Sequence, residues 1–172
     1  MVKKSCSLLF LLFLVGCSSM SGESLTNCTD IAASLVAGNI GETIIEVHGY
    51  EEEILLWTVS TTLTRDEFDE AFLHGTYLSD DEIHELFEYY SQREMEGVTF
   101  YIAELTSEHV VIAKVYDYSA IDVDELSRIW GVDNFENTVT LSSAIASLED
   151  QDAVCETIVI EREDDDDADE VD

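Results

Sequence analysis

Cysteine thiols are the side chains with the clearest chemical use in this sequence of 172 residues. The first of them lie in or just after an N-terminal segment that carries Lys3 and Lys4, no acidic residue, and the apolar run Leu8–Val15 (LLFLLFLV). A helix of eight residues is about 12 Å long, too short for the ~30 Å hydrocarbon core of a bilayer. We therefore expect residues 1–16 to be a secretory leader and not a membrane span.

Cys17 stands directly after this leader, in the segment Leu14-Val15-Gly16-Cys17. This segment resembles the lipobox of bacterial lipoproteins, in which an aliphatic residue and two small or apolar residues precede an obligatory cysteine. In that family a diacylglyceryl group is attached to the thiol and the leader is cut before it. The resemblance implies a protein anchored through Cys17 to the extracytoplasmic face of a bacterial cell membrane. The alternative is an ordinary cleaved leader that ends in a chance cysteine.

Cys28 and Cys155 are the cysteines that remain if Cys6 leaves with the leader and Cys17 carries the lipid. The pair would then be exported to a compartment in which disulfides persist. The sequence leaves two alternatives open, a Cys28–Cys155 bridge or two free thiols. A bridge would tie the start of the mature chain to its last apolar strand.

Carboxylates are the most numerous reactive groups, because 39 Asp and Glu face only 7 Lys and Arg and the net charge is −32. This charge excludes a nucleic-acid-binding protein, which needs a positive face to replace phosphate counterions. Acid pairs such as Asp66/Glu70 and Asp117/Asp122 have the residue types for glycosidic hydrolysis. Pairs of this kind arise by chance in so acidic a chain, so a surface hydrolase is only the alternative to a non-enzymatic binding protein.

Metal-binding patterns are incomplete in this sequence. The segment His84–Glu88 (HELFE) begins like a zinc-protease helix but lacks the second histidine. Asp164–Asp167 is similar to the start of a calcium-binding loop but lacks the glycine in mid-loop. We expect no structured metal site and no cofactor, only weak cation association with the acidic surface. Adaptation to high salt is another explanation of the acidity.

Aromatic side chains supply one further candidate, a groove for a ligand. Aromatic residues on strands and amphipathic helices belong more often to the core than to a binding site. We therefore expect core positions for most of the following residues: Trp57, Trp130, Tyr89, Tyr90, Tyr116 and Tyr118.

The elements that must position these side chains are indicated by the spacing of apolar residues. Two hairpins and a closing strand are expected at Thr43–Tyr50 with Ile54–Thr64, at Val98–Leu105 with His109–Tyr118, and at Ala153–Ile160. Helices are expected at Asp30–Ala37, at Asp66–Leu73, after a capping box that begins at Ser79, at Asp122–Trp130 and at Thr140–Leu148. This order predicts an α+β fold, with a mostly antiparallel sheet of about five strands and helices packed on one face.

The domain organisation follows from the same pattern. Residues 1–16 form the leader, residues 17–39 a tether and N-terminal segment, and residues 40–160 a single α+β domain. Residues 161–172 (EREDDDDADEVD) hold nine acids and one arginine. They contain almost nothing that can enter a core, so we expect an acidic disordered tail.

The order of elements also resembles that of the YehR-like small lipoproteins of bacteria, a family without an established function. The resemblance rests on the hairpin Thr43–Thr64, the helix Asp80–Gln92, the second hairpin ending in Tyr116-Asp117-Tyr118, and the terminal helix and strand. Lys114 is the only lysine left after cleavage, which departs from the lysine-rich members of that family. The resemblance implies no catalytic residues. We expect a non-enzymatic envelope lipoprotein that acts by interaction with an unknown partner.

Overall fold

The protein is described here from a computed structural model, which places residues 22–31, 41–131, 133 and 139–160. The expected leader, Cys17, most of the expected helix at Asp30–Ala37 and the expected acidic tail lie outside the described residues.

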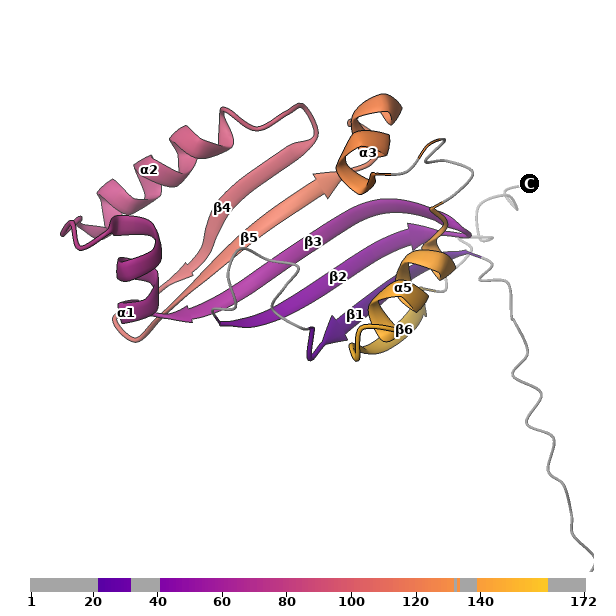
Figure 1. The fold of residues 1–172 in the computed structure, drawn as a ribbon, viewed down its shortest axis with the longest axis horizontal. Helices are drawn as coiled ribbons and strands as arrows, with labels where there is room; N and C mark the ends of the chain where they lie inside the picture. The colour runs from indigo at the N-terminus through magenta and orange to yellow at the C-terminus, as the bar shows by residue number, and fades with distance from the viewer. Residues whose placement is uncertain (1–21, 32–40, 132, 134–138, 161–172) are drawn as a thin grey trace, which may run out of the picture.

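In the described part of the chain, six strands form one antiparallel sheet, which confirms the predicted α+β class with one strand more than expected (Figure 1). The order across the sheet is β4-β5-β3-β2-β1-β6, so the second hairpin pairs with the first through β5 and β3. The strands are β1 Glu23–Thr29, β2 Glu42–Tyr50, β3 Glu53–Thr64, β4 Val98–Leu105, β5 His109–Asp117 and β6 Val154–Ile160.

Strand β1 corrects the predicted start of the domain at residue 40, because the sheet already begins at Glu23. The side chains of β1 that face the core are Ser24, Thr26 and Cys28, all of them buried. Two of these three are hydroxyl-bearing, so β1 lacks the alternation of apolar and polar residues that identifies a half-buried strand. The Thr26 hydroxyl instead forms a 2.8 Å hydrogen bond with the hydroxyl of Thr157 on β6.

The helices connect and cover these strands. They are α1 Arg65–Phe68, the π-helical turn η2 Asp69–Leu73, α2 Asp80–Ser91, α3 Val123–Trp130 and α5 Leu141–Glu149. The helix expected at Asp66–Leu73 is thus divided into an α-helical turn and a π-helical turn. It ends at His74, whose φ of 49° stops the helix in the left-handed region.

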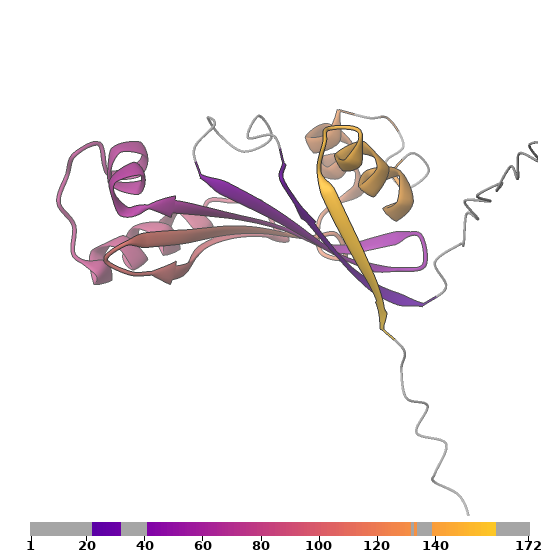
Figure 2. The same cartoon turned by 90° about the horizontal axis from the view of Figure 1, so that it is seen from below.

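The helices pack on one face of the sheet, as predicted. Trp57 and Leu63 point to the same side of β3, since they are separated by an even number of positions. Leu148 of α5 packs in the core cluster around Trp57, whereas Phe87 of α2 packs with Leu63 and Val110 in a second cluster. The two groups of helices therefore cover opposite ends of one long twisted face, which Figure 2 shows from the edge.

The capping box predicted at Ser79 is confirmed at the start of α2. The Glu82 carboxylate accepts hydrogen bonds from the Ser79 backbone N–H at 2.8 Å and from its hydroxyl at 2.7 Å. Thr64 and Glu67 form the same arrangement at the end of β3. This second box begins α1 directly after the strand, with no loop between them.

Candidate ligand pocket

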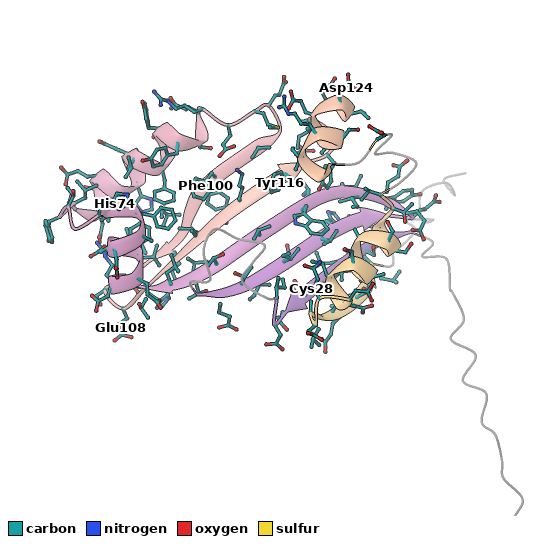
Figure 3. The ribbon with its side chains drawn as sticks, in the orientation of Figure 1. Cys28, His74, Phe100, Glu108, Tyr116 and Asp124 are labelled. Atoms are coloured by element: carbon teal, nitrogen blue, oxygen red, sulfur yellow. A yellow bond between two sulfur atoms is a disulfide. The ribbon has the colours of Figure 1, made fainter. Side chains whose placement is uncertain are left out.

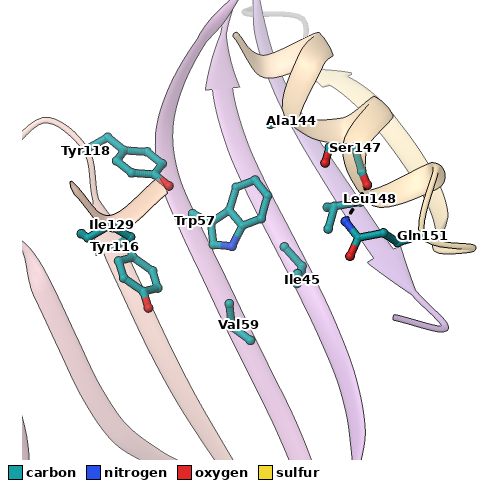
Figure 4. A pocket seen from close by; sticks show the side chains of 10 residues that line it. All are labelled: Ile45, Trp57, Val59, Tyr116, Tyr118, Ile129, Ala144, Ser147, Leu148 and Gln151. Carbon is teal, nitrogen blue, oxygen red and sulfur yellow. Dashed lines mark hydrogen bonds between the residues drawn. The ribbon is translucent and has the colours of Figure 1, made fainter. Parts of the chain in front are cut away.

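A pocket of about 240 Å³ lies between α5, α3 and the covered face of the sheet (Figure 4). Its walls come from two central strands, from β5 and the residue after it, and from the two helices. The lining residues are Ile45, Trp57, Val59, Tyr116, Tyr118, Ile129, Ala144, Ser147, Leu148 and Gln151.

Three aromatic side chains reach this pocket through the order of the sheet. Trp57 on β3 and Tyr116 on β5 are register partners, so their side chains stand next to each other on the same face. Tyr118 follows β5, and its backbone N–H donates a 3.0 Å hydrogen bond to the carbonyl of Leu55. The sheet therefore brings together aromatic residues that are far apart in the sequence.

Helix α5 forms the opposite wall and is fixed at its N-terminus. The Leu141 N–H donates to the carbonyl of Glu52 at 2.8 Å, and the Ser142 hydroxyl donates to the Glu52 carboxylate at 2.7 Å. Gly49 allows the helix to lie close to the sheet, because a Cβ at this position would be 2.6 Å from Cδ2 of Leu141. This close packing sets the distance between α5 and the aromatic wall.

Polar groups are few around the pocket, and none of the described residues that line it is acidic or basic. The polar side chains besides the two tyrosines are Ser147 and Gln151. Gln151 Nε2 donates a 2.7 Å hydrogen bond to the carbonyl of Ser147 on the preceding turn of α5. A lining of this kind suits an uncharged, mostly apolar molecule. An apolar cavity of about 150 Å³ accommodates benzene, so the pocket has room for a compound of one or two rings.

The expectation that the aromatic residues form core is only partly met. Trp57 is 6% exposed and belongs to the core, yet it also lines the pocket. Tyr89 and Tyr90 lie on α2, away from the pocket, and are partly exposed, with Arg93 stacked 4.1 Å above the Tyr89 ring. The side chain of Trp130 lies outside the described residues.

The acid pairs considered for hydrolysis do not line this pocket. Asp66 and Glu70 are exposed on α1 and η2. The Asp117 carboxylate accepts hydrogen bonds from the backbone N–H and the hydroxyl of Ser119, at 3.0 and 2.6 Å. Asp122 caps α3 by accepting a 2.9 Å hydrogen bond from the N–H of Asp124. The last two carboxylates thus hold local turns in place.

A second hollow of about 410 Å³ adjoins the pocket through Tyr118, which lines both. It contains two carboxylates, those of Glu52 and Glu53. The Glu52 carboxylate is the one that accepts the hydrogen bond from Ser142 at the start of α5. This residue therefore positions the helix that forms the wall of the first pocket.

The histidines lie apart from one another. His84 and Glu88 are exposed on α2, at the place where a zinc-protease pattern would begin. His48 contacts Glu23 at 2.7 Å, and His109 contacts Glu104 at 3.1 Å. Within the described part of the chain, no group of three or more His, Cys, Asp or Glu side chains is arranged to hold a metal ion.

Cys28 and Cys155 form a disulfide, which settles the choice that the sequence left open. The two residues are register partners on β1 and β6, with their Cα atoms 4.1 Å apart. Cys28 lies beneath α5 and is completely buried (Figure 3). The bond joins strands whose cysteines are 127 positions apart in the sequence.

No helix within the described ranges is long and apolar enough to cross a membrane.

Comparison with known proteins gives a weak structural likeness. No family model matches the chain, and no curated protein matches it in sequence. A solved structure described as "NMR structure of the protein from Streptococcus pneumoniae TIGR4" aligns with 91% of this chain and 99% of its own length, at 11% identity and a TM-score of 0.47. A likeness at this level identifies neither a family nor a function. The lipobox and the YehR-like resemblance therefore stay predictions.

Proposed function

We propose that this protein is a lipid-anchored extracytoplasmic binding protein that takes a small, uncharged, mostly apolar molecule into the pocket between α3 and α5. The observation that carries the binding proposal is the convergence of Trp57, Tyr116 and Tyr118 on one pocket. The observation that carries the anchor is the segment Leu14-Val15-Gly16-Cys17 after an apolar leader.

The chemistry of the lining supports an uncharged ligand. Aromatic rings offer a large apolar contact area, and tyrosine hydroxyls together with Gln151 can orient one polar group of a bound molecule. The net charge of −32 repels anions before they reach the surface, whereas it exerts no net force on a neutral compound.

The pocket is tested with the naphthalene dye prodan, an uncharged two-ring probe whose fluorescence shifts to shorter wavelength in apolar surroundings. The protein for this test is the chain from residue 18, since every described strand and helix begins at Glu23 or later. Ser147 lines the pocket but is exposed, so Ser147→Phe fills the space without disturbing the core. We expect this variant to lose at least tenfold in probe affinity.

Ala146→Phe is the matched control, because Ala146 is exposed on α5 and does not line the pocket. This variant should bind the probe as the unaltered protein does. Equal affinity of all three proteins, or no binding by any of them, would contradict the pocket proposal.

The anchor is tested by metabolic labelling of bacteria with a radioactive or alkyne-bearing lipid precursor. We expect the unaltered chain to take up the label and Cys17→Ala to lose it, since no other residue offers the lipobox thiol. Equal labelling of the two chains would end the lipoprotein proposal while leaving the pocket proposal intact.

The alternative of a carboxylate hydrolase gains no support from the pocket, because the described residues that line it include no carboxylate. No specific observation favours that second function, and we do not propose it.

A further inference from the structure

Strand β6 is the edge of the sheet, and within the described residues no other strand pairs with its outer side. Its residues are exposed along almost the whole strand. The large apolar side chains on it belong to both faces, and all four are β-branched: Val154, Ile158, Val159 and Ile160, with exposed fractions of 55%, 61%, 52% and 40%. An edge with these properties is a template for pairing with a further strand.

The opposite edge, β4, is protected in the way that natural sheets protect their edges. A β-bulge interrupts its pairing with β5 between Ile102 and Glu104, and helix α2 packs along it through the cluster that includes Phe87 and Ile102. β6 has no such irregularity, because seven consecutive residues pair with β1 without a shift in register. The two edges of one sheet thus differ in accessibility.

Strand β6 is also held in place before any partner binds. The disulfide between Cys28 and Cys155 and the 2.8 Å hydrogen bond between Thr26 and Thr157 both fix it to β1. A strand that is already ordered loses little conformational entropy when it pairs. Among the described residues, the strand is therefore preorganised on its inner side and unpaired on its outer side.

The charge of the chain indicates the kind of partner. Glu156 is the only charged residue of the strand. The twelve residues that follow Ile160 in the sequence hold nine acids and one arginine. Two copies of a chain with a net charge of −32 repel each other, whereas a basic segment is attracted.

We propose that β6 docks an extended segment of another protein, in which apolar residues alternate with lysine or arginine, as a seventh strand of the sheet. The main-chain hydrogen bonds of the new strand supply affinity, and contacts with Ile158 and Ile160, which share one face of β6, select apolar residues at alternate positions. This interaction is separate from the pocket, so each can fail without the other.

The experiment measures binding of a fluorescein-labelled eight-residue peptide of alternating lysine and valine by fluorescence anisotropy. The protein is the full chain in non-ionic detergent, and protein-free micelles give the baseline. The control peptide has the same sequence but carries N-methyl groups at alternate positions, which remove backbone donors and keep every charge. We expect the control peptide to bind at least tenfold more weakly, and equal binding would mean simple charge attraction and overturn the proposal.

The protein variants are Ile158→Ser and Ile160→Ser, two exposed positions on the same face of β6 whose replacement leaves the core intact. Each should weaken binding of the alternating peptide at least fivefold, with an unchanged circular dichroism spectrum. Tyr101→Ser on the other edge strand is the matched control, since Tyr101 is also 40% exposed, and it should bind as the unaltered chain does.

Two further results, from the protein variants and from the oligomeric state, would overturn the proposal. One is unchanged peptide affinity in both β6 variants. The other is a dimer in sedimentation experiments that Ile158→Ser dissociates, because the occupant of the edge would then be a second copy of this chain. Peptide binding that persists in the pocket variant Ser147→Phe would show that the two interactions are independent, as we expect.

Discussion

The carboxylates of Glu67 and Glu82 have local environments that change how they titrate. Each pKa lies below the ordinary value of 4.5, first because of a hydrogen bond from the hydroxyl of Thr64 or Ser79 and second because of one from the backbone N–H of the same residue. These bonds favour the ionised form. A pKa that is lower in the folded than in the unfolded chain contributes stability above the ordinary value, and that contribution is lost as the pH falls through the folded value.

Glu82→Gln tests this linkage, because glutamine retains an oxygen that can accept at the cap but carries no charge. The unaltered chain should exceed this variant in stability near pH 7, and the difference should shrink towards zero as the pH is lowered to about 3. Urea unfolding followed by circular dichroism at several pH values measures the difference. Glu88→Gln, on the same helix but outside the capping box, corrects for the loss of one negative charge. The same pH profile in both variants would contradict the prediction.

Among the structural elements, β1 and β6 depend most on a covalent bond. The disulfide closes a loop of 127 residues, so it restricts the unfolded chain strongly. It also joins the first and last strands of the described fold.

Reduction of this bond should lower the free energy of unfolding by about 2–5 kcal/mol. The measurement is urea denaturation with and without a reductant, with the double variant Cys28→Ser, Cys155→Ser as the control that no reductant can affect. If reductant destabilises the double variant as much as the unaltered chain, the effect does not come from this disulfide.

Several elements were predictable from the sequence, because their pattern is local. On β3, Trp57, Thr61 and Leu63 are buried at alternate positions, as the period of two predicts. The capping box at Ser79 and the left-handed Gly131 at the end of α3 likewise depend on adjacent residues.

Other elements were not predictable, because tertiary contacts decide them. β1 turns Ser24 and Thr26 inward, and their burial depends on pairing with β2, the next strand along the chain, and with β6, the last described strand. The pocket requires β3 to pair with β5, although β4 is the strand that follows β3 in the sequence. The types of Trp57 and Tyr116 suggested a groove, but only the register of these strands brings the two rings together.

For the molecule as a whole, charge dominates behaviour in solution. A net charge of −32 on 172 residues opposes the compact state, since folding brings like charges closer together. Four of the basic residues lie in the described part of the chain. Three of them contact carboxylates: Arg65 with Asp69 and Asp80, Lys114 with Glu94, and Arg128 with Glu125.

Salt should therefore stabilise this protein. Raising NaCl from about 10 to about 100 mM shortens the screening length from about 30 to about 10 Å, and we expect the melting temperature to rise by a few degrees. Differential scanning calorimetry measures the change, with sucrose at equal osmolality as the uncharged control. A melting temperature that is independent of salt, or that rises equally in sucrose, would show that self-repulsion does not limit stability.

The register between the outer strands has a consequence for orientation. Glu23, which begins β1, is the partner of Ile160, which ends β6, so both chain ends leave the domain at the same corner. Cys17 precedes Glu23 by six positions, a span of at most about 20 Å of extended backbone. With a lipid at Cys17, the acidic segment after Ile160 starts within that reach of the phospholipid headgroups. Anionic headgroups would then repel the acidic segment, and this repulsion would hold the folded domain away from the bilayer surface.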